Sequence, residues 1–135
     1  APLLKYALPL YIDELAGKYP GCKIVIAHFG FPYLLETATI LSKNENVFAD
    51  ISGTIDRQAS PEATARLARR YAEDLRRAVD YYPDIKKKIL FGTDYGGEHT
   101  HLDQVQPYID VVESVFPADE RADVFYASAQ RLFFS

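Results

Sequence analysis

The chain has 135 residues, 48% of them apolar, and carries a formal charge of −4 at neutral pH. This length and apolar share predict one globular unit over residues 1–135 with a buried core. The negative charge, the absence of a dense Lys/Arg block and the lack of any apolar run near the ~18 residues of a membrane span exclude nucleic acid and membranes as partners.

The first predicted helix is amphipathic and ends at residues 20–21, Pro-Gly. Its apolar face repeats at helical spacing and consists of Leu8, Tyr11, Ile12, Leu15, Ala16 and Tyr19. Cys22 follows as the single cysteine, so it cannot form an internal disulfide, and we expect a buried, inert thiol in a cytoplasmic protein. Residues 23–27 are nearly all apolar, a pattern that predicts a parallel strand covered by helices on both faces.

The remainder of the chain alternates helices with two further strands. A helix opened by Pro32 leads to a strand over residues 47–52, and Ser60 and Pro61 mark the start of a long helix that ends at Pro83. Its Arg residues alternate with Glu73 and Asp74, which indicates a solvated face. A strand over residues 88–93 follows. Two amphipathic helices over residues 105–116 and 122–133 complete the chain.

Two strands end in an ionisable side chain. In the segment IVIAHFG, the strand is followed by His28, and in the segment ILFGTDY, the strand is followed by Asp94. Right-handed crossovers make the three strands parallel, so His28, Ser52 and Asp94 fall on one edge of the sheet, where α/β proteins place their chemistry. Taken singly, His28 is better explained by a hydrogen bond to a neighbouring loop and Asp94 by a turn. Their joint placement favours a site.

These segments resemble the C-terminal part of the amidohydrolase superfamily. The likeness rests on four ordered motifs, KIVIAHFG, NVFADISG, ILFGTDY and ASAQRLF, and it extends over nearly the whole chain. The branch it resembles is the amidohydrolase-related one, which includes aminocarboxymuconate-semialdehyde decarboxylase. The resemblance implies the C-terminal portion, strands six to eight with their helices, of a metal-dependent (β/α)8 barrel.

The resemblance also implies roles for two residues. Asp94 matches the aspartate that binds the catalytic divalent metal, expected to be zinc, and acts as base. His28 matches the histidine at the end of strand six, so we expect an acid/base role, with metal ligation as the lesser option. Zinc lowers the pKa of bound water to about 7, which lets a nearby carboxylate take its proton. Just past these strand ends, Tyr95 and Phe31 are expected to wall a substrate pocket.

The metal site departs from the family pattern. The His-x-His of strand one and the histidine of strand five have no counterpart here, whereas a catalytic zinc takes three protein ligands. A complete barrel also needs about 250 residues. We therefore expect a fragment of a longer enzyme, completed by its N-terminal half or by further copies in a homo-oligomer. His99 and His101 form a His-x-His in a loop, and their role stays open.

The resulting hypothesis is part of a metal-dependent hydrolase or nonoxidative decarboxylase. Its substrate would be a small carboxylated molecule or a lactone or amide, and the isolated piece is expected to be inactive. Asp50 and Ser52 are not predicted to be catalytic, and Asp56 and Arg57 are candidates for contacting an anionic substrate. The alternative is a non-catalytic α/β binding or assembly module whose sheet edges are covered by another chain.

Overall fold

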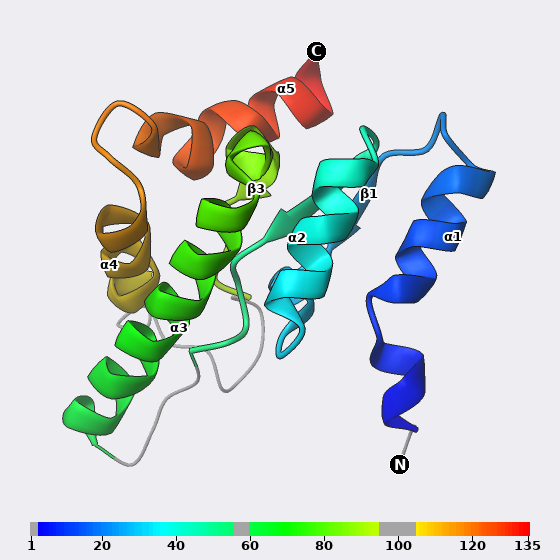
Figure 1. Cartoon of the computed structure of the whole chain (residues 1–135). Coiled ribbons are helices and arrows are strands. Elements are labelled where there is room, and N and C mark those ends of the chain that lie inside the picture. The colour runs from blue at the N-terminus through cyan, green and yellow to red at the C-terminus, as the bar shows by residue number, and fades with distance from the viewer. Residues whose placement is uncertain (1–2, 56–59, 95–104) are drawn as a thin grey trace.

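A computed structural model of the chain describes residues 3–55, 60–94 and 105–135 (Figure 1). The helices are α1 (Leu10–Lys18), α2 (Leu34–Lys43), α3 (Pro61–Tyr81), α4 (Val105–Val115) and α5 (Ser128–Phe134), and the strands are β1 (Ile24–Ile26), β2 (Val47–Asp50) and β3 (Ile89–Leu90). Shorter turns are η1 (Leu4–Ala7), η2 (Ala27–Gly30), η3 (Pro83–Lys88) and the π turn η5 (Asp123–Ala127). Within the described residues, no helix has both the length and the apolar character that crossing a membrane requires.

The three strands form one parallel sheet in the order β1-β2-β3, as the sequence predicts. Val25 pairs with Phe48, and Asp50 pairs with Leu90. The strands are shorter than predicted. β3 ends at Leu90, and the next amide, Phe91 N–H, donates to the carbonyl of Val124 at 2.9 Å. The fold is therefore α/β with three parallel strands, and their carboxyl ends share one edge.

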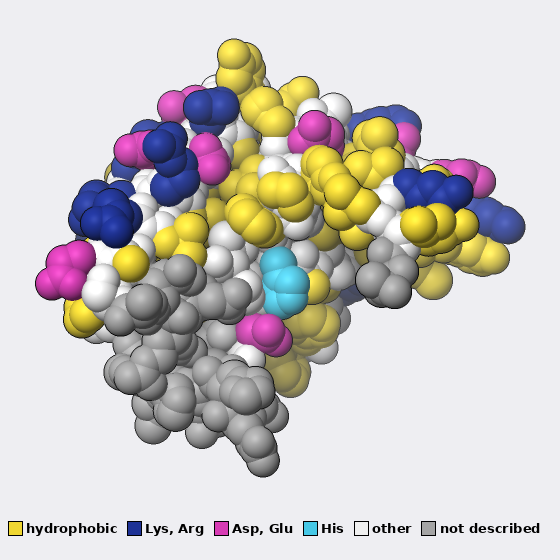
Figure 2. Space-filling view, turned by 90° about the horizontal axis from the view of Figure 1, so that it is seen from below, with side chains coloured by type: hydrophobic (Ala, Val, Ile, Leu, Met, Phe, Trp, Pro, Cys, Tyr) yellow, Lys and Arg dark blue, Asp and Glu magenta, His cyan; other side chains and the backbone are white. Residues whose placement is uncertain are grey.

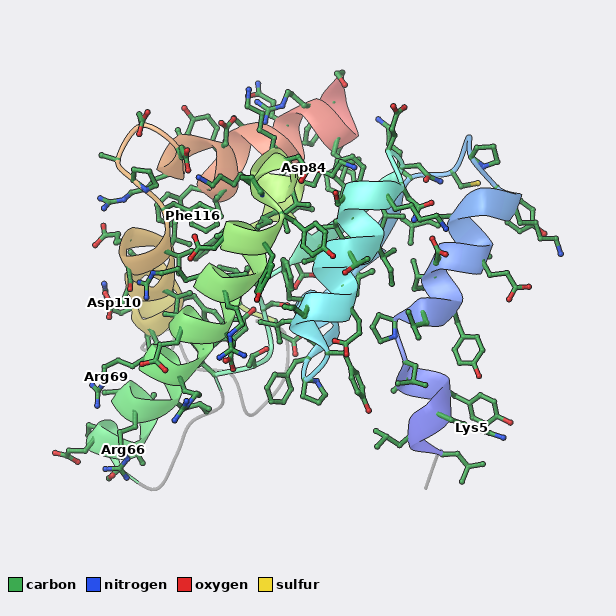
Figure 3. The ribbon with its side chains drawn as sticks, in the orientation of Figure 1. Lys5, Arg66, Arg69, Asp84, Asp110 and Phe116 are labelled. Atoms are coloured by element: carbon green, nitrogen blue, oxygen red, sulfur yellow. The ribbon has the colours of Figure 1, made fainter. Side chains whose placement is uncertain are left out.

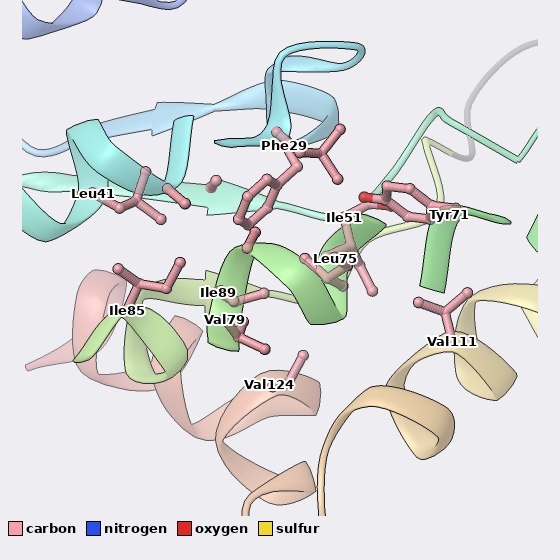
Figure 4. Packing of buried hydrophobic residues seen from close by; sticks show 14 of the residues in the cluster. Phe29, Leu41, Ile51, Tyr71, Leu75, Val79, Ile85, Ile89, Val111 and Val124 are labelled. Atoms are coloured by element: carbon pink, nitrogen blue, oxygen red, sulfur yellow. The ribbon is translucent and has the colours of Figure 1, made fainter. Parts of the chain in front are cut away.

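Helices α2 and α3 lie side by side against the sheet, α1 packs on the far side of α2, and α4 packs on α3 (Figure 1). Alternate residues of β2 and its extension point into this layer, since Val47, Ala49 and Ile51 are each 0% exposed. They belong to one hydrophobic core with side chains of α3, α4 and the C-terminal segment, and Figure 4 shows Ile51 of this group among Leu75, Val111 and Val124. On the opposite face of the sheet, Val25 and Phe48 are only half-buried. The prediction that helices cover both faces is therefore met only in part by the described residues.

The long helix α3 follows its sequence pattern closely. Ser60 caps it, since its hydroxyl accepts the N–H of Ala63 at 3.1 Å, and Pro61 occupies the first turn. Its apolar stripe is buried from Ala68 to Val79. On the outer side, Arg66 and Arg69 extend away from the body of the protein, which confirms a solvated charged face (Figure 3).

Helix α1 differs from its prediction. Of the apolar face predicted from Leu8 to Tyr19, only Ala16 is buried, while Tyr11 is 52% exposed and Leu15 43%. The reason is that the main packing partner of α1 is α2, which leaves much of the helix surface exposed. Cys22 is also exposed, contrary to the expectation of a buried thiol, because it lies in the turn between α1 and β1.

Two buried tyrosines hold the segment that follows β2. Tyr71 on α3 donates its hydroxyl to the carbonyl of Ile51 at 3.4 Å, and Tyr108 on α4 accepts the N–H of Ile55 at 3.0 Å. Burial raises the pKa of Tyr71, so its phenol stays protonated and available as a donor. The backbone from Ile51 to Ile55 is thereby fixed at both of its ends.

Replacing Tyr108 by Phe should destabilise the protein. The change leaves the Ile55 N–H buried without this acceptor, which costs about 1–3 kcal/mol of unfolding free energy. Denaturant unfolding measures the loss. The matched control is Tyr81→Phe, because Tyr81 is 70% exposed and its hydroxyl should contribute less than about 0.5 kcal/mol. Equal stabilities of the two variants would contradict the role given to Tyr108.

Candidate functional site

The chain leaves β1 through a turn of unusual backbone geometry. His28, Phe29 and Gly30 are consecutive and have φ values of 57°, 50° and 65°. The left-handed region suits glycine, but it costs an ordinary residue roughly 1–2 kcal/mol. Two neighbouring non-glycine residues in this conformation therefore require strong contacts from the surrounding structure.

Those contacts come from the core, from α2 and from β2. Phe29 is 0% exposed and fills the core between the sheet and the helices (Figure 4). Gly30 lies so close to Thr37 of α2 that a Cβ would collide with the threonine hydroxyl. From β2, the carboxylate Oδ1 of Asp50 accepts the backbone N–H of His28 at 3.2 Å. The turn is therefore determined by its tertiary neighbours.

The side chain of His28 is held by the end of β2. Its Nδ1 lies 3.0 Å from the carbonyl oxygen of Ser52 and 3.1 Å from the Ser52 hydroxyl. That hydroxyl donates to Oδ1 of Asp50, which also accepts the Ser52 N–H at 2.9 Å. Gly53, at φ 71°, lies directly against the ring, where a Cβ would overlap Nδ1 and Cε1. One side of the imidazole is thus fully occupied.

Asp94 is carried to the same edge by the residues after β3. It is exposed and has a φ of 58°. Between β3 and Asp94, the chain passes close to the end of β2 at Gly92, where an added Cβ would stand 3.2 Å from the Cβ of Ser52. Neighbouring strands lie about 4.8 Å apart, so β1 and β3 are separated by roughly 10 Å across β2. His28 and Asp94 therefore follow the two outer strands of the sheet, on either side of β2.

Figure 2 shows the molecule from the side on which these segments lie. A histidine side chain reaches the surface there, with an acidic side chain next to it and apolar side chains to one side. Of the three histidines in the chain, only His28 lies among the described residues, so the histidine coloured in Figure 2 is His28. The edge therefore presents an imidazole and a carboxylate beside apolar surface.

The other predicted site residues are described in part. Phe31 follows the turn and is 52% exposed, at a cis peptide bond to Pro32. Its contact with a substrate stays a prediction. Tyr95, Asp56, Arg57, His99 and His101 all lie outside the described residues.

The sequence reasoning missed Asp50 and Ser52, which hold His28 in place. The signal that indicates them is a carboxylate inside an apolar strand, since such a group must find hydrogen-bond donors when it is partly buried. Alternation along β2 and its extension then places Asp50 and Ser52 on the same face, toward the turn after β1.

The described residues do not make a complete metal centre. No group of three or more His, Cys, Asp or Glu side chains among them is arranged to hold an ion. His28 and Asp94 are two residues with metal-binding side chain types near the ends of the outer strands, whereas a catalytic zinc takes three protein ligands and an open position.

Comparison with known proteins matches this fold to one family. The family model described as amidohydrolase matches residues 3–134. The crystal structure of an amidohydrolase from Burkholderia multivorans with bound zinc aligns at a TM-score of 0.66 and 18% identity, over 90% of this chain and 47% of that one. A protein from Pseudomonas putida described as a 2-pyrone-4,6-dicarboxylic acid hydrolase aligns at 0.55 and 24% identity over the same shares. A comparison with curated proteins found no match.

Gly53→Ala should displace the His28 ring. The new methyl group collides with the imidazole, and the left-handed backbone adds a strain of about 1–2 kcal/mol. NMR should show shifted ring resonances of His28, and denaturant unfolding should show lower stability. Gly17→Ala is the control, because a Cβ at that helical position meets nothing within 4 Å and should stabilise α1 by up to about 1 kcal/mol. Unchanged His28 resonances in Gly53→Ala would contradict the packing.

Proposed function

This chain belongs to the amidohydrolase family, and we propose that its His28 edge is part of the active site of a hydrolase or nonoxidative decarboxylase. The observation that carries this proposal is the strained turn at His28, which β2 stabilises through Asp50 and Ser52. A strained backbone persists only where neighbouring structure enforces it, and such positions concentrate at functional sites. The chain spans about half the length of the solved structures that it matches, so the activity proposed is that of the whole protein.

The proposed role of His28 is proton transfer. A neutral imidazole takes a proton at physiological pH and returns it later in the reaction. In hydrolysis, it accepts a proton from the water that attacks the carbonyl carbon, and the C–O or C–N bond breaks as the leaving group takes that proton. In decarboxylation, the C–C bond breaks, carbon dioxide leaves, and the imidazolium protonates the remaining carbon.

We further propose that the whole protein binds a divalent metal, zinc in the first instance, with Asp94 among its ligands. The zinc bound to the Burkholderia multivorans amidohydrolase supports this choice. The remaining ligands have to come from outside the described residues, because those residues provide too few donors. The carboxylate of Asp94 also offers a second proton acceptor across β2 from His28.

The proposed substrate is a small carboxylated molecule with a lactone or amide bond. The description of the Pseudomonas putida protein as a 2-pyrone-4,6-dicarboxylic acid hydrolase supports a carboxylated lactone. The resemblance of the sequence motifs to the decarboxylase branch keeps loss of carbon dioxide as the competing reaction. A single cysteine supports the proposal of a cytoplasmic location.

His28→Gln should reduce kcat of the full-length protein by about 10²- to 10⁴-fold, the usual contribution of a positioned acid or base. The assay uses a panel of carboxylated lactones, amides and aromatic acids, with ring opening and carbon dioxide release followed separately. Asp80→Asn is the control, because Asp80 is exposed near the C-terminal end of α3 and should leave turnover unchanged. Full activity in His28→Gln would contradict the proposed role.

Asp94→Asn should lower both the metal content and the turnover of the full-length protein. Protein purified without chelators should carry about one divalent ion per chain by elemental analysis, since a single catalytic zinc serves one active site. Loss of one anionic ligand weakens that site while the fold persists, because Asp94 is exposed. Metal-free wild-type protein with turnover that Asp94→Asn leaves unchanged would favour the non-catalytic binding module instead.

We also propose that further strands complete the sheet, supplied by an N-terminal barrel half or by other copies of the chain. Within the described residues, β1 and β3 each pair only with β2, and the apolar side of α1 is open at Leu10, Tyr11 and Leu15. Unpaired strand edges and an exposed apolar face favour association.

The 135-residue chain by itself should therefore self-associate in light scattering. The double variant Tyr11→Lys with Leu15→Lys should reduce the mass, because two charges on the open face of α1 oppose contact. Tyr81→Lys is the matched control on α3, because the tyrosine is 70% exposed and α2 lies between α3 and α1 (Figure 1). A monomeric wild-type chain would contradict the proposal.

A further inference from the structure

The hydrogen-bond pattern around His28 determines where its ring proton lies. Nδ1 is 3.0 Å from the carbonyl oxygen of Ser52, and a carbonyl oxygen can only accept. A bare Nδ1 would set two lone pairs against each other at that distance. The neutral ring therefore carries its proton on Nδ1, and its lone pair lies on Nε2.

The Ser52 hydroxyl is oriented by Asp50. Oδ1 of Asp50 accepts two backbone N–H groups, those of His28 at 3.2 Å and Ser52 at 2.9 Å, so this oxygen acts as an acceptor. The Ser52 hydroxyl donates its hydrogen to the same oxygen. Its own lone pairs then face Nδ1 of His28 at 3.1 Å, where they accept from the ring N–H. Asp50 thus prevents the hydroxyl from donating to Nδ1.

The ring is also held in place sterically. Gly53 lies against Nδ1 and Cε1, and the backbone N–H of His28 is tied to Asp50. No described residue forms a hydrogen bond to Nε2, and the side chain is half-exposed at the face shown in Figure 2. Nε2 is therefore the ring nitrogen that forms no hydrogen bond with the described residues, on a side chain that reaches this face of the molecule.

We propose that Asp50 is a positioning residue that acts through Ser52 to fix His28 in the Nδ1–H tautomer and present Nε2 as the proton-accepting atom. This inference rests on the proposed function for its catalytic meaning, since the reaction gives Nε2 its use. The tautomer itself follows from the contacts alone. Partners that orient a functional histidine in this way typically change activity by about 10- to 100-fold when removed.

The test is nitrogen NMR of His28 in the full-length protein at a pH where the imidazole is neutral, with the signals assigned by their loss in His28→Gln. The wild type should show a protonated Nδ1 and an unprotonated Nε2. In Asp50→Ala, the Ser52 hydroxyl is free to donate to Nδ1, so signals of the Nε2–H tautomer should appear. The kcat should fall by about 10- to 100-fold with little change in KM.

Asp50→Asn keeps an acceptor oxygen at the same place and should restore most of the Nδ1–H tautomer. Asp80→Ala on α3 is the control and should change neither spectrum nor kcat. If Asp50→Ala does not fold, Asp50→Leu takes its place, because leucine has a similar shape and no acceptor oxygen. Ser52→Ala removes the hydroxyl but keeps the backbone carbonyl beside Nδ1, so the Nδ1–H tautomer should persist in that variant. Appearance of the Nε2–H tautomer in Ser52→Ala would contradict the proposal.

A wild-type protein in the Nε2–H tautomer would overturn the inference, as would an unchanged Nδ1–H tautomer in a folded Asp50 variant that lacks the acceptor oxygen. The proposed function is tested by turnover, and that result can differ from the result for the tautomer. A protein with the Nδ1–H tautomer and no turnover on any substrate would support the assignment of the proton while contradicting the proposed reaction.

Discussion

One carboxylate oxygen connects the ends of two strands in this fold. Oδ1 of Asp50 accepts hydrogen bonds from the backbone of His28, the backbone of Ser52 and the hydroxyl of Ser52. Because β1 and β2 are parallel, their carboxyl ends come together, and a side chain at the end of one can satisfy the backbone of the other. The left-handed turn at His28 depends on this interaction, since its backbone conformation is unfavourable by itself.

The same turn is coupled to the hydrophobic core. Phe29 follows His28 directly and is completely buried, so the aromatic ring anchors the turn while the imidazole remains half-exposed. Burying a side chain of this size contributes about 1.5–3 kcal/mol, comparable to the strain of the turn. Tyr71 and Tyr108 support the other side of the site through the backbone of Ile51 and Ile55. Packing energy from α3 and α4 therefore holds the position of a functional side chain.

The described residues form a closely packed core, but they leave other surfaces and the candidate metal site incomplete. The layer between the strands and α2 and α3 is closely packed, and its largest side chains are fully buried. The outer side of α1 and the second face of the sheet are only partly covered. This asymmetry agrees with a chain that spans about half the length of the structures that it matches. It also agrees with the lack, among the described residues, of a group of three side chains that could hold a metal ion.

The sequence by itself predicted the α/β class, the three parallel strands and the buried stripe of α3, because apolar periodicity and capping are local signals. It also identified His28 and Asp94 as the polar residues that follow two of the strands. Only the tertiary structure assigned Asp50 and Ser52 to His28, because those hydrogen bonds join segments whose approach depends on strand register. The exposure of α1 and Cys22 was likewise decided by neighbours, since burial depends on what packs against a residue as well as on its own polarity.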